Sequence, residues 1–161
     1  MNALNPYLKQ YQKDSVETAS PEKLLILLYD GAIQFLNKAK LTMESGDYSQ
    51  THNNLLGCQN IILEFMSTLD MKQGGDLAKN LYNLYEYYYN TLVTANLKKD
   101  IKLVDEVLRH LIKLRETWQQ AINIANSERK REEDSRKKSS GDYYGDDDDD
   151  EDDDEDDEDD D

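Results

Sequence analysis

Four stretches of the chain carry apolar residues three and four positions apart, which is the spacing of one face of an α-helix. The fourth stretch shows the pattern clearly, with Val104, Leu108, Leu111 and Trp118 on one stripe. Strict alternation of apolar and polar residues, the signature of a half-buried strand, is absent from the sequence. The pattern therefore predicts four helices and no sheet.

Residues suited to helix ends separate the four stretches. They are, in chain order, Ser20 with Pro21, Gly46, Asp47 with Gln50, the pair Gly74 and Gly75, and Asp100. Ser and Asp side chains accept hydrogen bonds from the free amides at a helix start, and Gly adopts the left-handed conformation that ends a helix. Gly31 lies inside the first helical pattern, where we expect it to permit a close contact with another helix.

The short connections make consecutive helices antiparallel neighbours. We therefore expect an all-α fold, an antiparallel up-down four-helix bundle over residues 20–126. Residues 1–19 show no sustained period and are interpreted as an N-terminal arm. Residues 127–145 mix charges of both signs and are interpreted as a charged helix end and linker, followed by a disordered acidic tail at 146–161.

The charge of the chain is concentrated at its C-terminus. Residues 146–161 are all Asp or Glu, so they supply 16 of the 35 acidic residues and leave 19 acidic against 19 basic residues elsewhere. The body is formally neutral and lacks the excess of basic residues that nucleic-acid binding requires, so we expect no nucleic-acid partner. No stretch is apolar enough to insert into a bilayer, and the N-terminus does not resemble a signal peptide, which favours a cytoplasmic protein.

The residues that usually carry enzyme chemistry are few. His52 and His110 have no sequence neighbours typical of a catalytic or di-metal site, and no phosphate-binding glycine loop follows a strand. The single cysteine, Cys58, has no second thiol with which to bind a metal or form an internal disulfide, and we expect it to be a small buried residue. We therefore expect no enzymatic activity, no metal and no cofactor.

Tyrosines crowd the third helical stretch, at positions 82, 85, 87, 88 and 89. Five tyrosines within eight positions cover most of a helix circumference, so some must point away from the core. Two interpretations stay open: Tyr85 and Tyr88 are core while the others lie along neighbouring helices, or the group forms a protein-binding surface. Surplus apolar residues beside the stripes, such as Ile61, also favour a partner that covers them.

Several motifs together resemble the FliS family of flagellar export chaperones over about residues 5–126. They are Asn5-Pro6-Tyr7 with Tyr11 and Val16, Ser20-Pro21-Glu22, Leu28-Tyr29-Asp30-Gly31-Ala32, Gln59-Asn60-Ile61-Ile62, Leu84-Tyr85-Glu86-Tyr87 and Leu114-Arg115-Glu116-Thr117-Trp118. Each motif is weak alone, but their order and approximate spacing follow the family along one bundle. The chain is similar to this family.

The resemblance implies an export chaperone that binds the C-terminal helical region of flagellin, prevents its premature polymerisation and delivers it to an export-gate membrane protein. It also implies that Tyr7, Tyr11 and Val16 form an N-terminal cap, with the choice between Tyr7 and Tyr11 as main cap left open. The flagellin-binding groove is expected on the second and third helices. Its expected residues are Ile61, Ile62, Phe65, Leu69, Leu81, Leu84, Tyr85 and Tyr88.

Two other functions stay open at this point. One is a self-associating bundle, for example a weak homodimer whose interface contains the tyrosines. The other is a regulatory adaptor that uses residues 146–161 to bind a basic partner, because the family pattern assigns the acidic tail no role.

Overall fold

The computed structural model describes residues 19–141, and these residues form four α-helices without any strand. The helices are α2 (Pro21–Glu44), α3 (Tyr48–Thr68), α4 (Gly75–Lys98) and α5 (Ile101–Gly141). The chain divides after Ile122 into two units, so the bundle contains α2, α3, α4 and the first part of α5. The predicted all-α class is confirmed. The cap residues Tyr7, Tyr11 and Val16 and the tail at 146–161 lie outside the described residues.

The helices begin and end where the cap residues predict. The side chain of Ser20 accepts a hydrogen bond from the amide of Lys23 at 3.2 Å, and Asp47 accepts one from the amide of Gln50 at 3.2 Å. Gly46 has φ +77°, the left-handed conformation that suits glycine after the end of α2. Asp100 accepts from the amide of Lys102 at 3.0 Å at the start of α5. These local bonds satisfy amides that a helix leaves without partners at its first turn.

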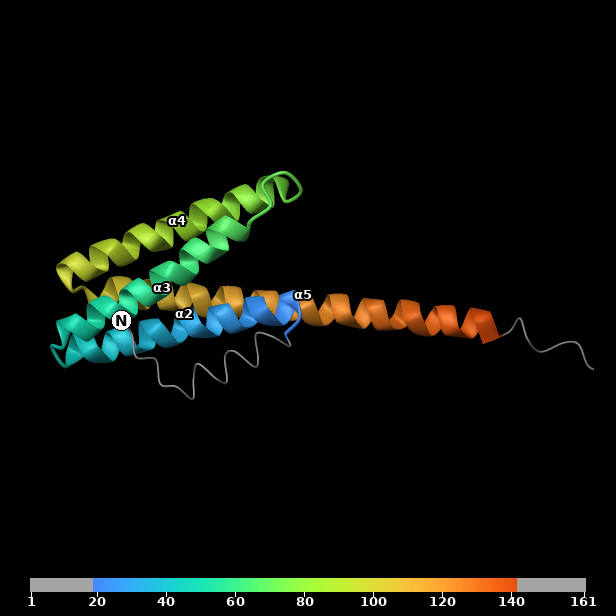
Figure 1. Ribbon diagram of the computed structural model, residues 1–161, viewed down its shortest axis with the longest axis horizontal. Helices are drawn as coiled ribbons and strands as arrows, with labels where there is room; N and C mark the ends of the chain where they lie inside the picture. The colour runs from blue at the N-terminus through green and yellow to red at the C-terminus, as the bar shows by residue number, and fades with distance from the viewer. Residues whose placement is uncertain (1–18, 142–161) are drawn as a thin grey trace, which may run out of the picture. The chain divides into compact units, whose positions relative to one another are not determined.

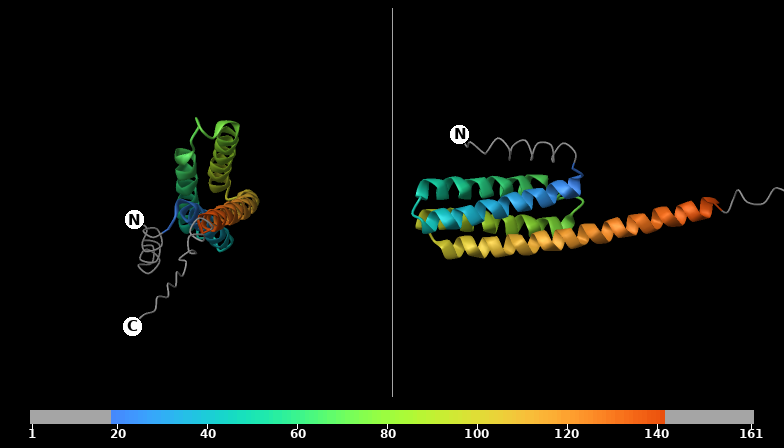
Figure 2. Two further views of the ribbon diagram at one scale, coloured as in Figure 1. Left: turned by 90° about the vertical axis from the view of Figure 1, so that its right-hand side faces the viewer. Right: turned by 90° about the horizontal axis from the view of Figure 1, so that it is seen from below.

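Polar contacts join each helix of the bundle to the next, in the order α2, α3, α4, α5 and back to α2. The contacts are Thr42 with Thr51 at 2.9 Å, His52 with Asn96 at 2.7 Å, Tyr87 with Glu106 at 2.6 Å, and Lys40 with Asp105 at 2.8 Å. Three of them bring the end of one helix beside the start of its neighbour, as antiparallel packing requires. The predicted up-down four-helix bundle is confirmed, and Figure 2 shows its helices alongside one another.

Apolar side chains from all four helices fill the interior of the bundle. The fully buried members include Leu36 of α2, Cys58 of α3, Leu92 of α4 and Leu111 of α5. Burial also raises the pKa of the Cys58 thiol, which keeps it in the unreactive neutral form. The expectation of a buried Cys58 is confirmed. In Figure 1 the α3–α4 pair is inclined to α2 and the first part of α5.

Two glycines fix how closely α2 and α3 approach. A Cβ atom at Gly31 would lie 3.3 Å from the Cδ1 atom of Ile61 on α3, which confirms the predicted close helix contact. A Cβ atom at Gly57 would lie only 2.6–2.8 Å from three ring atoms of Phe35 on α2. The Phe35 ring therefore occupies the space that a larger residue at position 57 would need.

The C-terminal part of the described chain is more regular than the sequence indicates. Helix α5 continues to Gly141, although we expect a helix end and linker at 127–145. Residues 132–134 are acidic and residues 136–138 are basic, so each acidic residue precedes a basic one by four positions. This spacing and order stabilise an exposed helix without a core. Helix α5 therefore covers most of the segment that the sequence assigns to a charged helix end and linker.

Candidate binding surface

Four of the eight predicted groove residues belong to the core. Ile62, Phe65, Tyr85 and Tyr88 are each at most 2% exposed. Phe65 stacks on Tyr29 with ring centroids 4.5 Å apart, and the Tyr85 ring lies 5.3 Å from that of Phe65. The aromatic rings of α2, α3 and α4 thus meet at the centre of the bundle, where a partner cannot reach them unless the helices rearrange.

The hydroxyl groups of this aromatic cluster bond to one another. The Tyr29 and Tyr85 hydroxyls are 2.6 Å apart, and the indole Nε1 of Trp118 donates to the Tyr29 hydroxyl at 3.1 Å. Burial raises the pKa of both tyrosines, and it raises the pKa of Tyr88 to about 12. All three hydroxyls are therefore neutral at physiological pH. The network satisfies polar atoms that would otherwise be costly to bury.

The other four predicted groove residues lie at the edges of the core. Ile61, Leu69, Leu81 and Leu84 are partly buried and pack against it. Ile61 reaches toward α2, where its Cδ1 atom lies over Gly31. The eight residues therefore do not form one exposed groove in this structure, and their role in binding flagellin stays a prediction.

A different set of apolar side chains is exposed along α3 and α4. Leu56 and Leu63 on α3 are 40% and 45% exposed, and Tyr82 and Val93 on α4 are 37% and 38% exposed. We call these four residues the α3–α4 stripe. Because an α-helix has 3.6 residues per turn, Leu56 and Leu63 lie on the same side of α3 as His52. By the same spacing, Tyr82 and Val93 lie on the same side of α4 as Asn96. The hydrogen bond between His52 and Asn96 shows that these sides of α3 and α4 face the boundary between the two helices.

Apolar doublets in the sequence could have revealed this stripe. In Leu55-Leu56, Ile62-Leu63 and Leu92-Val93 the first residue is fully buried and the second is exposed. A helix that buries only one stripe needs no second apolar residue at these positions. The exposed second residue of each pair therefore indicates an apolar surface that the core does not need. An assignment based only on the buried stripe does not identify these residues.

The tyrosine-rich part of α4 is divided between core and surface. Tyr85 and Tyr88 are core, which confirms the first of the two interpretations for these two residues, while Tyr82 and Tyr87 are exposed. The Tyr87 hydroxyl donates to the Glu106 carboxylate at 2.6 Å. Only Tyr82 belongs to the stripe, and a protein-binding role for the exposed tyrosines stays a prediction.

Both histidines contact a neighbouring helix. The amide of Asn96 donates to Nδ1 of His52 at 2.7 Å, and Nδ1 of His110 is 3.0 Å from the Tyr88 hydroxyl. Among the described residues, no three His, Cys, Asp or Glu side chains come close enough to hold a metal ion. The same part of the chain has no helix long and apolar enough to cross a membrane.

Comparison with known proteins identifies the family. The family model described as flagellar protein FliS matches residues 3–125. The flagellar secretion chaperone FliS of Bacillus subtilis (strain 168) is 38% identical over 126 residues, which cover 78% of this chain and 90% of the relative. The flagellar secretion chaperone FliS of Salmonella typhimurium (strain LT2) is 36% identical over 129 residues, which cover 77% of this chain and 96% of the relative.

A solved structure supports the fold. The crystal structure of a flagellar chaperone from bacteria aligns with a TM-score of 0.61 and 19% identity, covering 73% of this chain and 96% of that chain. The family match ends close to the end of the bundle at Ile122, so residues 126–161 lie outside it. The resemblance seen in the motifs is confirmed, and the chain belongs to the FliS family of flagellar secretion chaperones.

Proposed function

We propose that this chain is a cytoplasmic export chaperone that binds the C-terminal helical region of flagellin, prevents its premature polymerisation and delivers it to the flagellar export apparatus. Membership of the family supports a role in flagellar secretion. The α3–α4 stripe is the observation that carries the proposed binding, because it offers apolar side chains to a helix or an extended segment.

The stripe is large enough to matter energetically. Full burial of a Leu or Val side chain stabilises by about 1.5–3 kcal/mol. Covering a side chain that is about 40% exposed recovers roughly that share, or about 1 kcal/mol per residue. Four such residues contribute a few kcal/mol of apolar binding free energy, which salt does not screen. The body is also formally neutral, so the attraction between net charges adds little to binding. The complex should therefore persist when the ionic strength is raised severalfold.

The N-terminal arm has a place in this proposal. Tyr7, Tyr11 and Val16 would cover apolar surface of the bundle in the free chain and leave it when flagellin binds. Delivery would then bring the loaded chaperone to the export-gate membrane protein. No enzymatic step and no cofactor is required for holding or delivering a segment.

The stripe can be tested by replacing Leu63 with Asp. A carboxylate at this position removes apolar contact and must lose water when flagellin binds, so we expect affinity for flagellin to fall at least tenfold. Isothermal titration calorimetry with intact flagellin, and with flagellin lacking its C-terminal segment, provides the measurement. Leu77→Asp is the matched control, because Leu77 is 64% exposed on α4 and lies about 140° around that helix from Tyr82, away from the stripe.

Circular dichroism and urea unfolding of both variants separate binding from folding. Leu63 is already 45% exposed, so the helix content of the variant should match that of the parent. Equal affinities for Leu63→Asp, Leu77→Asp and the parent chain would refute the stripe as the binding surface. Full affinity for flagellin without its C-terminal segment would refute the proposed ligand region.

A further inference from the structure

A lysine at the end of α4 has a backbone conformation that lysine rarely adopts. Lys99 follows the last residue of α4 and has φ 51° and ψ 45°, the left-handed conformation. Among residues 19–141 it is the only residue other than glycine with a positive φ. Glycine or asparagine usually occupies this position after a helix, because a larger side chain is strained there. The lysine therefore indicates a side chain whose role compensates for the backbone.

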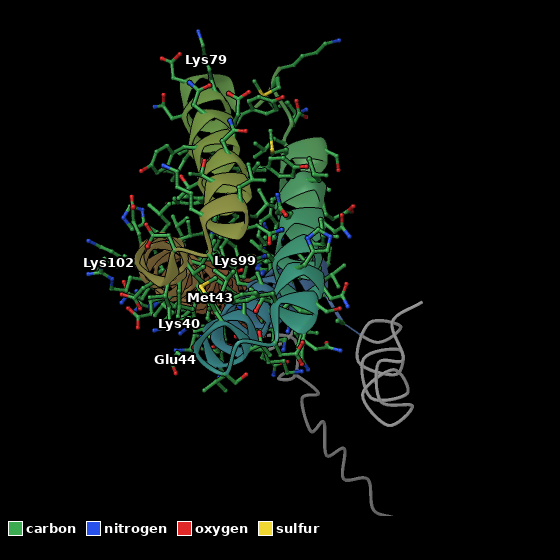
Figure 3. The ribbon with its side chains drawn as sticks, turned by 90° about the vertical axis from the view of Figure 1, so that its left-hand side faces the viewer. Lys40, Met43, Glu44, Lys79, Lys99 and Lys102 are labelled. Atoms are coloured by element: carbon green, nitrogen blue, oxygen red, sulfur yellow. The ribbon has the colours of Figure 1, made fainter. Side chains whose placement is uncertain are left out.

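Two neighbouring side chains hold the Lys99 ammonium group in one place. The group donates to Oδ1 of Asn96 at 2.6 Å, and it lies 5.6 Å from the centroid of the Tyr48 ring. Tyr48 is the first residue of α3, so the cation joins the end of α4 to the start of α3. Fixing a lysine side chain costs conformational entropy. Figure 3 shows Lys99 at this end of α4 and Lys79 at the opposite end.

The Lys99 ammonium group has no carboxylate partner within residues 19–141. The neighbouring carboxylates bond elsewhere, because Asp47 caps α3 and Asp100 caps α5. An ammonium group has three N–H donors, and Asn96 accepts one of them. Lys99 therefore presents a positive charge with unused donors in a defined position.

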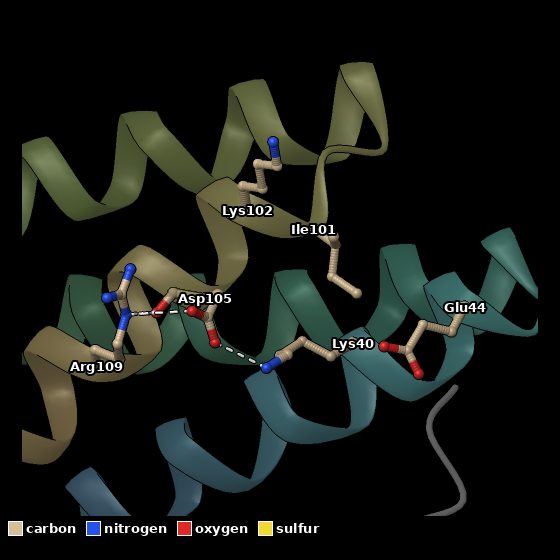
Figure 4. Close-up of a pocket in the computed structure, with 6 residues that line it drawn as sticks. All are labelled: Lys40, Glu44, Ile101, Lys102, Asp105 and Arg109. Atoms are coloured by element: carbon tan, nitrogen blue, oxygen red, sulfur yellow. Dashed lines mark hydrogen bonds and ion pairs between the residues drawn. The ribbon is translucent and has the colours of Figure 1, made fainter.

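Two other cations at the same end of the bundle show the usual way of fixing a charge. Lys40 and Arg109 contact one carboxylate, that of Asp105, at 2.8 Å and 3.2 Å, as the dashed lines in Figure 4 show. Lys99 differs because uncharged groups hold it. Its charge stays available to a carboxylate from another molecule, and such charge-assisted hydrogen bonds are the strong ones.

The ammonium group lies beside one end of the α3–α4 stripe. Asn96, which holds it, also donates to Nδ1 of His52 across the boundary between the two helices. Leu56 lies one turn of α3 after His52, and Val93 lies one turn of α4 before Asn96. A segment that covers the stripe therefore reaches the ammonium group within about one further turn of helix.

We propose that Lys99 binds a carboxylate of the flagellin segment that lies on the α3–α4 stripe. This contact rests on the proposed function and deepens it, because apolar burial is non-directional whereas a fixed charge at one end selects which way the segment lies. The carboxylate is either the C-terminal carboxylate of flagellin or an Asp or Glu side chain of the segment. Both offer the same oxygen acceptors to the ammonium group. Asn96 and Tyr48 act as positioning residues.

Isothermal titration calorimetry of the full chain with intact flagellin tests the contact. Lys99→Met removes the charge and keeps most of the apolar stem, so affinity should fall about threefold to tenfold at low ionic strength. Lys98→Met is the matched control, because Lys98 is the last residue of α4 and lies about 160° around the helix from Asn96. This variant loses the same charge from the same helix end and should bind like the parent.

Salt dependence separates an ion pair from a structural role of Lys99. Between about 50 mM and about 500 mM salt, the affinity of the parent should fall severalfold while the complex persists, because one charge pair is screened. Lys99→Met should show a flatter dependence, and Lys99→Arg should retain most of the affinity and the salt dependence of the parent. Thermal unfolding of the variants checks the fold, since methionine and arginine leave the same left-handed backbone strain as lysine.

A synthetic peptide of the flagellin C-terminal segment distinguishes the two sources of the carboxylate. Amidation of its C-terminus should remove the difference between the parent and Lys99→Met if the terminal carboxylate is bound. Replacement of its Asp and Glu side chains by Asn and Gln should remove the difference if a side chain is bound. A difference that survives both changes made together would overturn the proposed contact.

Two results with intact flagellin would also overturn it. They are equal affinities of Lys99→Met and the parent chain, and an equal loss of affinity in Lys98→Met and Lys99→Met. In either case flagellin still binds the parent chain, so the proposed function stands without this contact. Flagellin that fails to bind the parent chain at all would refute the proposed function itself, so the two failures are distinguishable.

Discussion

Replacing each of the two glycines at the α2–α3 contact with alanine should change stability in opposite directions. Gly31 and Gly57 both lie well inside their helices, at the eleventh residue of α2 and the tenth of α3. Alanine at either site gains about 1 kcal/mol of helix propensity over glycine. Because this gain is common to the two variants, any difference between them reports the space available for the new methyl group.

The structure gives the two sites very different space. At Gly31 the new methyl carbon would lie 3.3 Å from Cδ1 of Ile61, the end of a flexible side chain that can move by a few tenths of an ångström. At Gly57 it would lie 2.6 Å from the nearest atom of the Phe35 ring, which packs against the core. Overpacking of this kind costs about 1–3 kcal/mol. We therefore expect Gly31→Ala to stabilise by up to about 1 kcal/mol, and Gly57→Ala to destabilise by about 1–2 kcal/mol net.

Urea unfolding followed by circular dichroism and by fluorescence of Trp118 measures the difference. Trp118 is the single tryptophan of the chain and bonds to Tyr29 in the bundle, so its emission reports the same unit. A double-mutant cycle with Phe35→Leu provides the control, because a smaller side chain at position 35 should relieve the clash and make Gly57→Ala less harmful. Equal stabilities for Gly31→Ala and Gly57→Ala would refute the reasoning.

Two further predictions concern the polar contacts of the bundle. Tyr29→Phe should lower the free energy of unfolding by about 1–3 kcal/mol, because it leaves the buried Tyr85 hydroxyl without this partner. Tyr85→Phe should lower it by only about 1 kcal/mol, because Trp118 still bonds to Tyr29, and urea midpoints of the two variants provide the comparison. The hydrogen bond from Lys40 lowers the pKa of the Asp105 carboxyl, so this carboxylate stabilises the fold above the ordinary Asp pKa of about 4, and the contribution disappears as the pH falls through the lowered value. Asp105→Asn should therefore be less stable than the parent at neutral pH and equal to it in strong acid, as thermal unfolding across that pH range would show; a gap that persisted in acid would contradict the assignment.

Sequence reasoning predicts the helices well because local residues determine where they begin and end. Ser20, Gly46, Asp47 and Asp100 act through bonds and backbone angles within four residues, so no knowledge of the tertiary structure is needed. The end of α5 is different. Its mixed charges predict a helix end and linker at 127–145, while their spacing of four positions favours continued helix.

The exposed apolar residues of α3 and α4 are harder to predict, because they depend on which member of each apolar pair faces inward. Periodicity assigns Ile62 and Leu63 to adjacent directions but does not say which direction the neighbouring helices cover. Burial in the structure resolves this, placing Ile62 in the core and Leu63 on the surface. The role of the expected groove residues in binding flagellin stays a prediction, because burial shows which of them pack in the core and not which of them a partner contacts.

The second unit of the chain has consequences for calorimetry and spectroscopy. Side chains at 123–140 are all exposed, so this helix buries no apolar surface whose loss could make its melting abrupt. Heating should therefore reduce its ellipticity gradually, beginning below the transition of the bundle, and with little heat absorption of its own. The helical signal lost in the sharp transition will be smaller than the helix content of the chain, and an analysis that assigns the whole signal to one transition will underestimate its cooperativity.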